Sequence, residues 1–337
     1  MTDALKAHCS TLRSEIFDQG FLPEWLHVAG PKVTVNLPFA AALEARRLIE
    51  QDPLLRGYTW TIQHSIETLP RSQSAEITAA AKNVIAIASG KGGVGKSSVC
   101  VNLALALAAT GARVGILDAD IYGPSLPLMM GNEGAKLTFT PNRKMFPLQE
   151  KGLQLNSLGY LVDKDDATVW RGPMASGALQ QLYSDTQWSG LDYLLIDMPP
   201  GTGDIQLTLA QKLPLTGALI VTTPQTVALR DAQKGIAMFR KVNVPIVGIL
   251  ENMSGFLCSH CGQHDDIFGR DGALAVADAQ AVPIIGQWPL ATALRESMDA
   301  GQPLVYDKPD HPYSALILES SQRLAMNAWS LLREEGS

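Results

Sequence analysis

The sequence is poor in the features that mark specialised protein classes. Only four cysteines occur among 337 residues, too few for the dense disulfide framework of a small secreted domain. Its 27 lysines and arginines are outnumbered by 33 acidic residues, which argues against sequence-independent nucleic-acid binding because that needs a basic surface. The apolar stretch 99–109 is interrupted by Asn102 and is too short to span a bilayer. Residues 1–10 have no apolar signal-peptide core, so we expect a cytoplasmic protein with no membrane and no nucleic-acid partner.

The composition is that of an ordinary globular protein, with 46% hydrophobic and 18% charged residues. This composition can bury a large core. We predict a small α+β domain over residues 1–69, a linker rich in Ser, Ala and Gln over 70–82, and a larger domain over 83–337. Apolar periodicity predicts the element order αββαβ in the small domain. The predicted elements are helix 4–19, strands 25–28 and 32–37, helix 39–51 and strand 58–62.

The larger domain alternates apolar strands with helical segments. Its predicted strands are rich in Val, Ile and Leu without polar alternation, which is typical of strands buried on both faces. The pattern predicts an α/β fold with a mostly parallel sheet covered by helices. Ligands in such folds bind at the carboxyl ends of strands, where we expect every motif described below. The strands are predicted at 84–88, 113–117, 193–196, 218–222, 246–250 and 283–286.

The most informative stretch is the glycine-rich run GKGGVGKS at 90–97, between the strand 84–88 and the helical segment 98–109. Its glycines allow backbone N–H groups to curl around an anion at the start of a helix. Lys96 can then reach the β- and γ-phosphates of ATP, and the Ser97 hydroxyl can hold Mg²⁺. We therefore predict a phosphate-binding loop rather than a glycine-rich turn without a ligand. Its nucleotide-binding residues are Gly90, Lys91, Gly92, Gly93, Val94, Gly95, Lys96, Ser97 and Ser98.

Carboxylates follow two further strands. Asp118 and Asp120 come after the strand 113–117; beside a γ-phosphate, such a pair can serve Mg²⁺ through its water shell and orient the attacking water. Asp197 ends an apolar strand ahead of a Pro/Gly-rich turn, in the motif DMPPGTGD at 197–204. Alone, Asp118 and Asp120 could be a solvated or capping pair at a strand end, and 197–204 could be a plain turn with Asp204 as the N-cap of the next helix. With a phosphate-binding loop upstream, they predict the metal side of a nucleotide site.

Lys91 is not required by the basic phosphate-loop motif. With this second lysine, GKGGVGKS resembles the loop of the deviant Walker A ATPases, a P-loop NTPase family. In that family the extra lysine crosses a dimer interface to the nucleotide of the partner subunit. The resemblance therefore implies an ATPase that forms a homodimer and closes on ATP.

The same resemblance implies roles for individual residues. Asp120 would orient the attacking water, while Asn252 and Pro289 stand where the family builds its adenine pocket. The implied catalytic residues are Lys91, Lys96, Asp120 and Asp197, and the implied magnesium-side residues are Ser97, Asp118 and Asp197.

A close cysteine pair indicates a second site. Cys258 and Cys261 have two residues between them and can bind one metal centre together, but zinc and cubane iron–sulfur clusters usually take four ligands. Two chains on a two-fold axis would supply the pair twice, enough for a shared [4Fe–4S] cluster. A zinc site could instead recruit His260 or His264 within the chain. A redox pair would need a thioredoxin-like fold, and two unligated thiols are the last alternative.

The other two cysteines do not repeat this spacing. Cys9 lies in a predicted helix and Cys100 in the helix after the phosphate-binding loop. We expect both to be packed small side chains rather than ligands, because free cysteine is among the most buried residue types.

The motifs around the cysteine pair resemble one particular branch of the deviant Walker A ATPases. DMPPGTGD, NMS at 252–254, CSHCG at 258–262 and IFG at 267–269 resemble the iron–sulfur cluster carriers of the Mrp/ApbC type, over about residues 83–310. The resemblance implies that ATP hydrolysis accompanies transfer of a [4Fe–4S] cluster to apo-proteins, with cluster-assembly proteins as donors.

Two alternatives come from other classes. A positioning or partition ATPase acting on membrane or DNA would want a basic amphipathic tail, whereas residues 313–337 set Arg323 and Arg333 against three glutamates. A zinc-binding, nucleotide-dependent metallochaperone would use the cysteine pair without iron. Metal analysis separates these classes from a cluster carrier.

Overall fold

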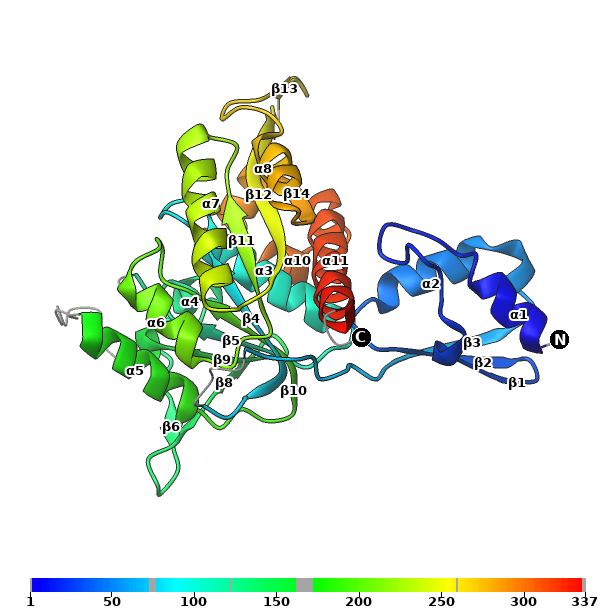
Figure 1. Ribbon diagram of the computed structural model, residues 1–337, viewed down its shortest axis with the longest axis horizontal. Helices are drawn as coiled ribbons and strands as arrows, with labels where there is room; N and C mark the ends of the chain where they lie inside the picture. The colour runs from blue at the N-terminus through cyan, green and yellow to red at the C-terminus, as the bar shows by residue number, and fades with distance from the viewer. Residues whose placement is uncertain (1, 73–76, 122, 162–171, 259, 335–337) are drawn as a thin grey trace.

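The computed structural model describes residues 2–72, 77–121, 123–161, 172–258 and 260–334. These residues form a small N-terminal unit beside a large α/β body (Figure 1). The C-terminal helix α11 (Pro312–Glu334) belongs to the body and lies on the side that faces the small unit (Figure 1).

The α/β body is built on a nine-stranded sheet. Its central strands run parallel in the order β14-β12-β11-β4-β10-β5-β9, and the short strands β13 and β8 pair antiparallel with β12 and β9. This confirms the predicted α/β fold with a mostly parallel sheet. The strands are β4 (Ala81–Ala88), β5 (Val114–Asp118), β8 (Leu148–Glu150), β9 (Leu153–Ser157), β10 (Leu191–Asp197), β11 (Gly217–Thr222), β12 (Ile246–Leu257), β13 (His264–Asp265) and β14 (Ile284–Leu290).

Helices cover both faces of this sheet, so its central strands are largely apolar. Every residue of β5, β10 and β11 is buried, as expected for parallel strands between two helical layers. Helix α3 packs on the sheet beneath α10 and α11, whereas α7 and α8 pack against β11, β12 and β14, with α6 beside α7 and α5 beside α6. The helices are α3 (Lys96–Ala109), α4 (Leu126–Met129), α5 (Gly172–Ser184), α6 (Asp204–Lys212), α7 (Thr226–Lys241), α8 (Gly272–Gln280), α9 (Thr292–Asp299) and α10 (Leu304–Asp307).

Among the parallel strands, three depart clearly from the sequence prediction, and the short strands β8 and β13 were not predicted. Strand β9 was not predicted, because Gln154 and Asn156 interrupt its apolar pattern; Asn156 is nevertheless buried and donates its amide to the Thr186 hydroxyl at 2.6 Å. Strands β12 and β14 run further than predicted, so Asn252 and Pro289 lie inside strands and not past their ends. That placement was wrong because a register shift between Asn252 and Phe256 lets β12 continue through a polar stretch that read as its end.

The small N-terminal unit has the predicted order αββαβ, in which β2 pairs antiparallel with β1 and parallel with β3. Its first helix is shorter than the predicted 4–19. The helix ends at Cys9. Just beyond it, the hydroxyls of Ser10 and Thr11 donate to the backbone carbonyls of Lys6 and His8, and such side-chain bonds to the backbone compete with a further helical turn. The elements are α1 (Thr2–Cys9), β1 (Leu26–Ala29), β2 (Lys32–Leu37), α2 (Ala42–Gln51) and β3 (Thr59–His64), and a separate hairpin β6 (Thr138–Phe139) and β7 (Met145–Phe146) extends from the body.

Aromatic packing joins the small unit to α11. The Trp329 ring lies 5.6 Å from the Trp25 ring and 5.2 Å from the Phe39 ring, between centroids. Its indole N–H donates to the Glu67 carboxylate at 3.0 Å. Strand β4 begins at Ala81, within the segment predicted as a linker; the division into 1–69, 70–82 and 83–337 stays a prediction. In the part of the chain that the structure describes, no helix is long and apolar enough to cross a bilayer.

Candidate functional site

The phosphate-binding loop occupies the turn between β4 and α3. Gly93 and Gly95 have φ angles of 81° and 82°, a region that other residues rarely adopt. Gly90 is required for a different reason, since a Cβ there would lie 2.2 Å from the backbone of Asp231 in α7. The loop thus opens directly into α3, whose first residue is Lys96, and the positive end of that helix faces the bound anion in such loops.

Lys96 brings the predicted catalytic carboxylates together. Its side chain is 6% exposed, and its Nζ lies 2.5 Å from Asp197 Oδ1 and 3.7 Å from Asp120 Oδ2. Burial disfavours the ammonium form, but the charge and hydrogen bond of Asp197 outweigh it and raise the pKa of Lys96. Lys96 is therefore a charged side chain at the carboxyl ends of β10 and β5, ready to receive phosphate.

Asp118 is held more tightly than the sequence indicated. It ends β5, is buried, and accepts hydrogen bonds from the N–H groups of Asp120 and Leu126 and from the Ser157 hydroxyl, at 3.0–3.2 Å. Burial and the nearby charge of Asp197 raise the pKa of Asp118 to about 7. The carboxylate fixes the backbone at Asp120 and at Leu126. Ser157, which sequence reasoning missed, orients the carboxylate.

The predicted magnesium-side residues Ser97, Asp118 and Asp197 lie around one narrow gap that is too small for a water molecule in this structure. The gap is also lined by Cys100, Val101, Ile116 and Leu126. A hydroxyl and carboxylate oxygens are the ligands that Mg²⁺ takes in nucleotide sites, so the residues fit this ion. These residues would hold Mg²⁺ beside a bound nucleotide, where the ion would neutralise phosphate charge. The individual roles of the three residues stay predictions.

The structure brings Asn252 to the phosphate-binding loop. Its side-chain amide donates to the Val94 carbonyl at 2.9 Å and lies 2.3 Å from where a Cβ on Gly95 would stand. Pro289 lies on the adjacent strand β14, with its carbonyl accepting from the Tyr313 hydroxyl at 2.9 Å. Their part in adenine binding stays a prediction, while the contact of Asn252 with the loop adds a structural role.

Lys91 is hydrogen-bonded to a residue of its own chain. Its Nζ donates to Gln225 Oε1 at 3.2 Å, just ahead of α7. Gln225 was missed by sequence reasoning, although its place after β11, at the same sheet edge as the other motifs, is a signal that could have found it.

The cysteine pair lies on a tight hairpin between β12 and β13. Cys258 directly follows β12, and its backbone exchanges hydrogen bonds of 2.9 Å with Gln263 and Gly262. Cys258 is half-buried and Cys261 is exposed. Backbone N–H groups of Cys261 and then His260 lower the pKa of the Cys258 thiol, which favours the thiolate that binds metal.

The described residues of one chain do not complete a metal-binding set around the cysteine pair. Among the described residues, no group of three or more His, Cys, Asp or Glu side chains could hold an ion. His264 turns to Asp266 instead, with Nδ1 3.5 Å from Oδ1. The remaining cysteines, Cys9 and Cys100, are buried, as predicted. The pair therefore stands at the surface, and the described residues add no third ligand to it.

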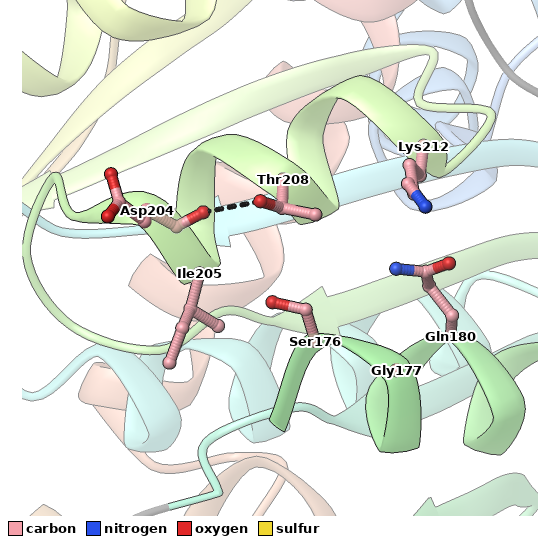
Figure 2. A pocket seen from close by; sticks show the side chains of 7 residues that line it. All are labelled: Ser176, Gly177, Gln180, Asp204, Ile205, Thr208 and Lys212. Atoms are coloured by element: carbon pink, nitrogen blue, oxygen red, sulfur yellow. Dashed lines mark hydrogen bonds between the residues drawn. The ribbon is translucent and has the colours of Figure 1, made fainter. Parts of the chain in front are cut away.

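A separate pocket lies between α5 and α6. Figure 2 shows Gln180 and Lys212 pointing toward each other across one end, while the Thr208 hydroxyl donates to the Asp204 carbonyl at the other. Its volume is about 390 Å³. No residue predicted for the nucleotide or cysteine site lines it. The lining residues are Ser176, Gly177, Gln180, Asp204, Ile205, Thr208 and Lys212.

Comparison with known proteins decides the family. Residues 80–325 match the ParA family of NUBPL iron-transfer P-loop NTPases. The chain belongs to this family. It is 55% identical over 328 residues to the iron-sulfur cluster carrier protein of Escherichia coli K12, covering 95% of this chain and 87% of that relative. It is 48% identical over 243 residues to the mouse iron-sulfur cluster transfer protein NUBPL, covering 72% and 75% of the two chains.

Solved structures agree with this assignment. A nucleotide-binding protein from Archaeoglobus fulgidus in complex with ADP is 34% identical, with a TM-score of 0.60, over 70% of this chain and 91% of that one. The cell division ATPase MinD of Pyrococcus furiosus, at 22% identity and a TM-score of 0.54 over 72% and 98% of the chains, shares the fold. The family predicted from the motifs is confirmed, and the chain is a P-loop ATPase.

Proposed function

We propose that this family member is an ATP-dependent carrier of a [4Fe–4S] cluster, which it holds between two copies of the chain and passes to apo-proteins in the cytoplasm. One observation carries the proposal: Cys258 and Cys261 are presented on a surface hairpin at the end of β12, the strand whose Asn252 holds the phosphate-binding loop. Cluster-assembly proteins are the donors in this proposal.

Hydrolysis follows from the buried charges at the loop. Lys96, already paired with Asp197, exchanges part of that contact for the β- and γ-phosphates when ATP binds. Asp120 lies 3.7 Å from Lys96 and orients the attacking water. Asp118 holds the backbone that carries Asp120, through the hydrogen bond from the Asp120 N–H. Lys91, from the partner copy, adds positive charge as negative charge develops on the transferred phosphoryl group.

Cargo binding follows from counting thiolates. A cubane cluster takes about four of them, and each chain offers Cys258 and Cys261 on one exposed hairpin. A two-fold axis beside the hairpin doubles the set. Two apolar side chains flank the pair in the sequence and are exposed, Leu257 by 60% and Ile267 by 52%. They suit a contact between copies, because exposed apolar side chains gain stability when a partner covers them.

Metal content after anaerobic reconstitution tests the proposal. We expect about four iron and four sulfide per dimer, measured by iron and sulfide assays with native mass spectrometry. Cys258→Ser or Cys261→Ser should abolish stable loading, because each removes two of the four thiolates. His260→Ala and His264→Ala are matched controls on the same hairpin and should load normally. A monomer with an intact cluster, or zinc bound through one of these histidines, would overturn the proposal.

A further inference from the structure

The extra lysine of the phosphate-binding loop is bonded within its own chain. Lys91 Nζ lies 3.2 Å from Gln225 Oε1, and both side chains are half-buried. Gln225 is the residue before α7, where a side chain often caps the free N–H groups of the first turn. Gln225 makes no such cap. Its amide oxygen is instead an acceptor for the ammonium of Lys91.

The backbone around Lys91 is also set against α7. A Cβ at Gly90 would stand 2.2 Å from the Asp231 backbone, so loop and helix touch directly. The Ser89 hydroxyl donates to the Lys91 carbonyl at 2.9 Å. With the backbone fixed on both sides, the direction of the Lys91 side chain is decided by what its ammonium bonds to.

The chemistry of Gln225 suits a contact that must be released. A neutral amide oxygen holds an ammonium, but without the charge that would make the pair a salt bridge. A phosphate of the partner's nucleotide carries that charge and is the stronger acceptor. The contact therefore directs Lys91 inward in a single chain and yields when an ATP-loaded partner arrives.

We propose that Gln225 is a positioning residue that holds Lys91 in cis until the partner's nucleotide competes for it. The inference rests on the homodimer proposed above, in which Lys91 acts across the interface. We call the Lys91–Gln225 contact the clip. The clip slows hydrolysis, because this contact must break before Lys91 can reach the partner's phosphates.

Two substitutions at Gln225 should act in opposite directions. Gln225→Ala removes the acceptor and should raise ATP turnover at low protein concentration by roughly 3- to 10-fold, the effect of about one hydrogen bond. Gln225→Glu adds a negative charge and should lower turnover by a similar factor, with recovery at high salt because the new pair is screened. Turnover is measured across a range of protein concentrations, and Thr226→Ala, at the neighbouring exposed position, is the control expected to match the parent chain.

A double-mutant cycle separates positioning from a structural effect. In a Lys91→Ala background neither Gln225 substitution should change the residual turnover, since the clipped group is gone. Parallel losses in both Gln225 variants, or effects that persist without Lys91, would overturn the clip. Unchanged turnover in Lys91→Ala alone would instead refute the trans role in the proposed function, whereas a loss there with inert Gln225 variants would refute only the clip.

Discussion

The two sites of this molecule are built on opposite principles. At the nucleotide site, Lys96, Asp118 and Asp197 are buried and bonded to partners in the same chain. At the cysteine site, Cys258 and Cys261 stand on a surface hairpin, and the described residues of one chain complete no metal-binding set. The reaction that is the same in every cycle is thus preorganised by the fold, while the cysteine pair, which we propose as the cargo site, lies open at the surface.

The two sites also differ in how they affect the free energy of folding. A buried charge cluster is costly unless every member is paired, so the Lys96–Asp197 pair must form as the domain folds. The hairpin imposes no such demand, because exposed thiols are solvated. Substitutions at the first site should therefore affect both stability and activity, whereas those at the second should affect loading alone.

The largest effect is expected from Lys96→Ala. Hydrolysis should fall by at least about 10²-fold, because a preorganised charge on the phosphates is lost. Unfolding free energy should also fall by about 3–5 kcal/mol, because the buried Asp197 loses its counter-charge. Adding Asp197→Asn should recover stability without recovering hydrolysis. Denaturant titration beside steady-state turnover gives both values, and full stability in Lys96→Ala would show that this site is less tightly coupled to the fold than its burial indicates.

A smaller effect is expected from Asp197 and Asp120, and we expect the two substitutions to impair different steps. Asp197→Ala should weaken Mg²⁺-dependent nucleotide binding by about 10- to 100-fold, as when a residue that holds a metal shell is removed. Asp120→Ala should leave binding intact and slow hydrolysis by about 10²-fold. Nucleotide titration and single-turnover kinetics separate the two. Equal losses of nucleotide affinity in both variants would remove the distinction between metal and water roles.

The sequence predicted the parts of these sites that are continuous in the chain, and missed those that only folding brings together. GKGGVGKS is one continuous stretch, so its strand, turn and helix were predictable from local pattern, and parallel strands bring Asp118 and Asp197 to the same edge. Ser157 ends β9, and Gln225 stands between β11 and α7. Neither carries a motif, and both reach the site only through tertiary packing. The true ends of β12 were hidden for a related reason, because pairing with β14 extends the strand through polar residues.

The smallest effect is the sharpest test of the comparison. Cys258→Ser and Cys261→Ser should leave ATP affinity and basal turnover of the cluster-free protein within about twofold, the range of a surface substitution. The reason is structural: the contact of β12 with the loop is made by Asn252 to the Val94 carbonyl, and the hairpin lies beyond the end of that strand. Asn252→Ala is the matched variant on the same strand and should weaken nucleotide binding. Isothermal titration with ATP on both variants decides the matter, because a loss in the cysteine variants equal to that in Asn252→Ala would mean that the open hairpin and the buried site are one cooperative unit.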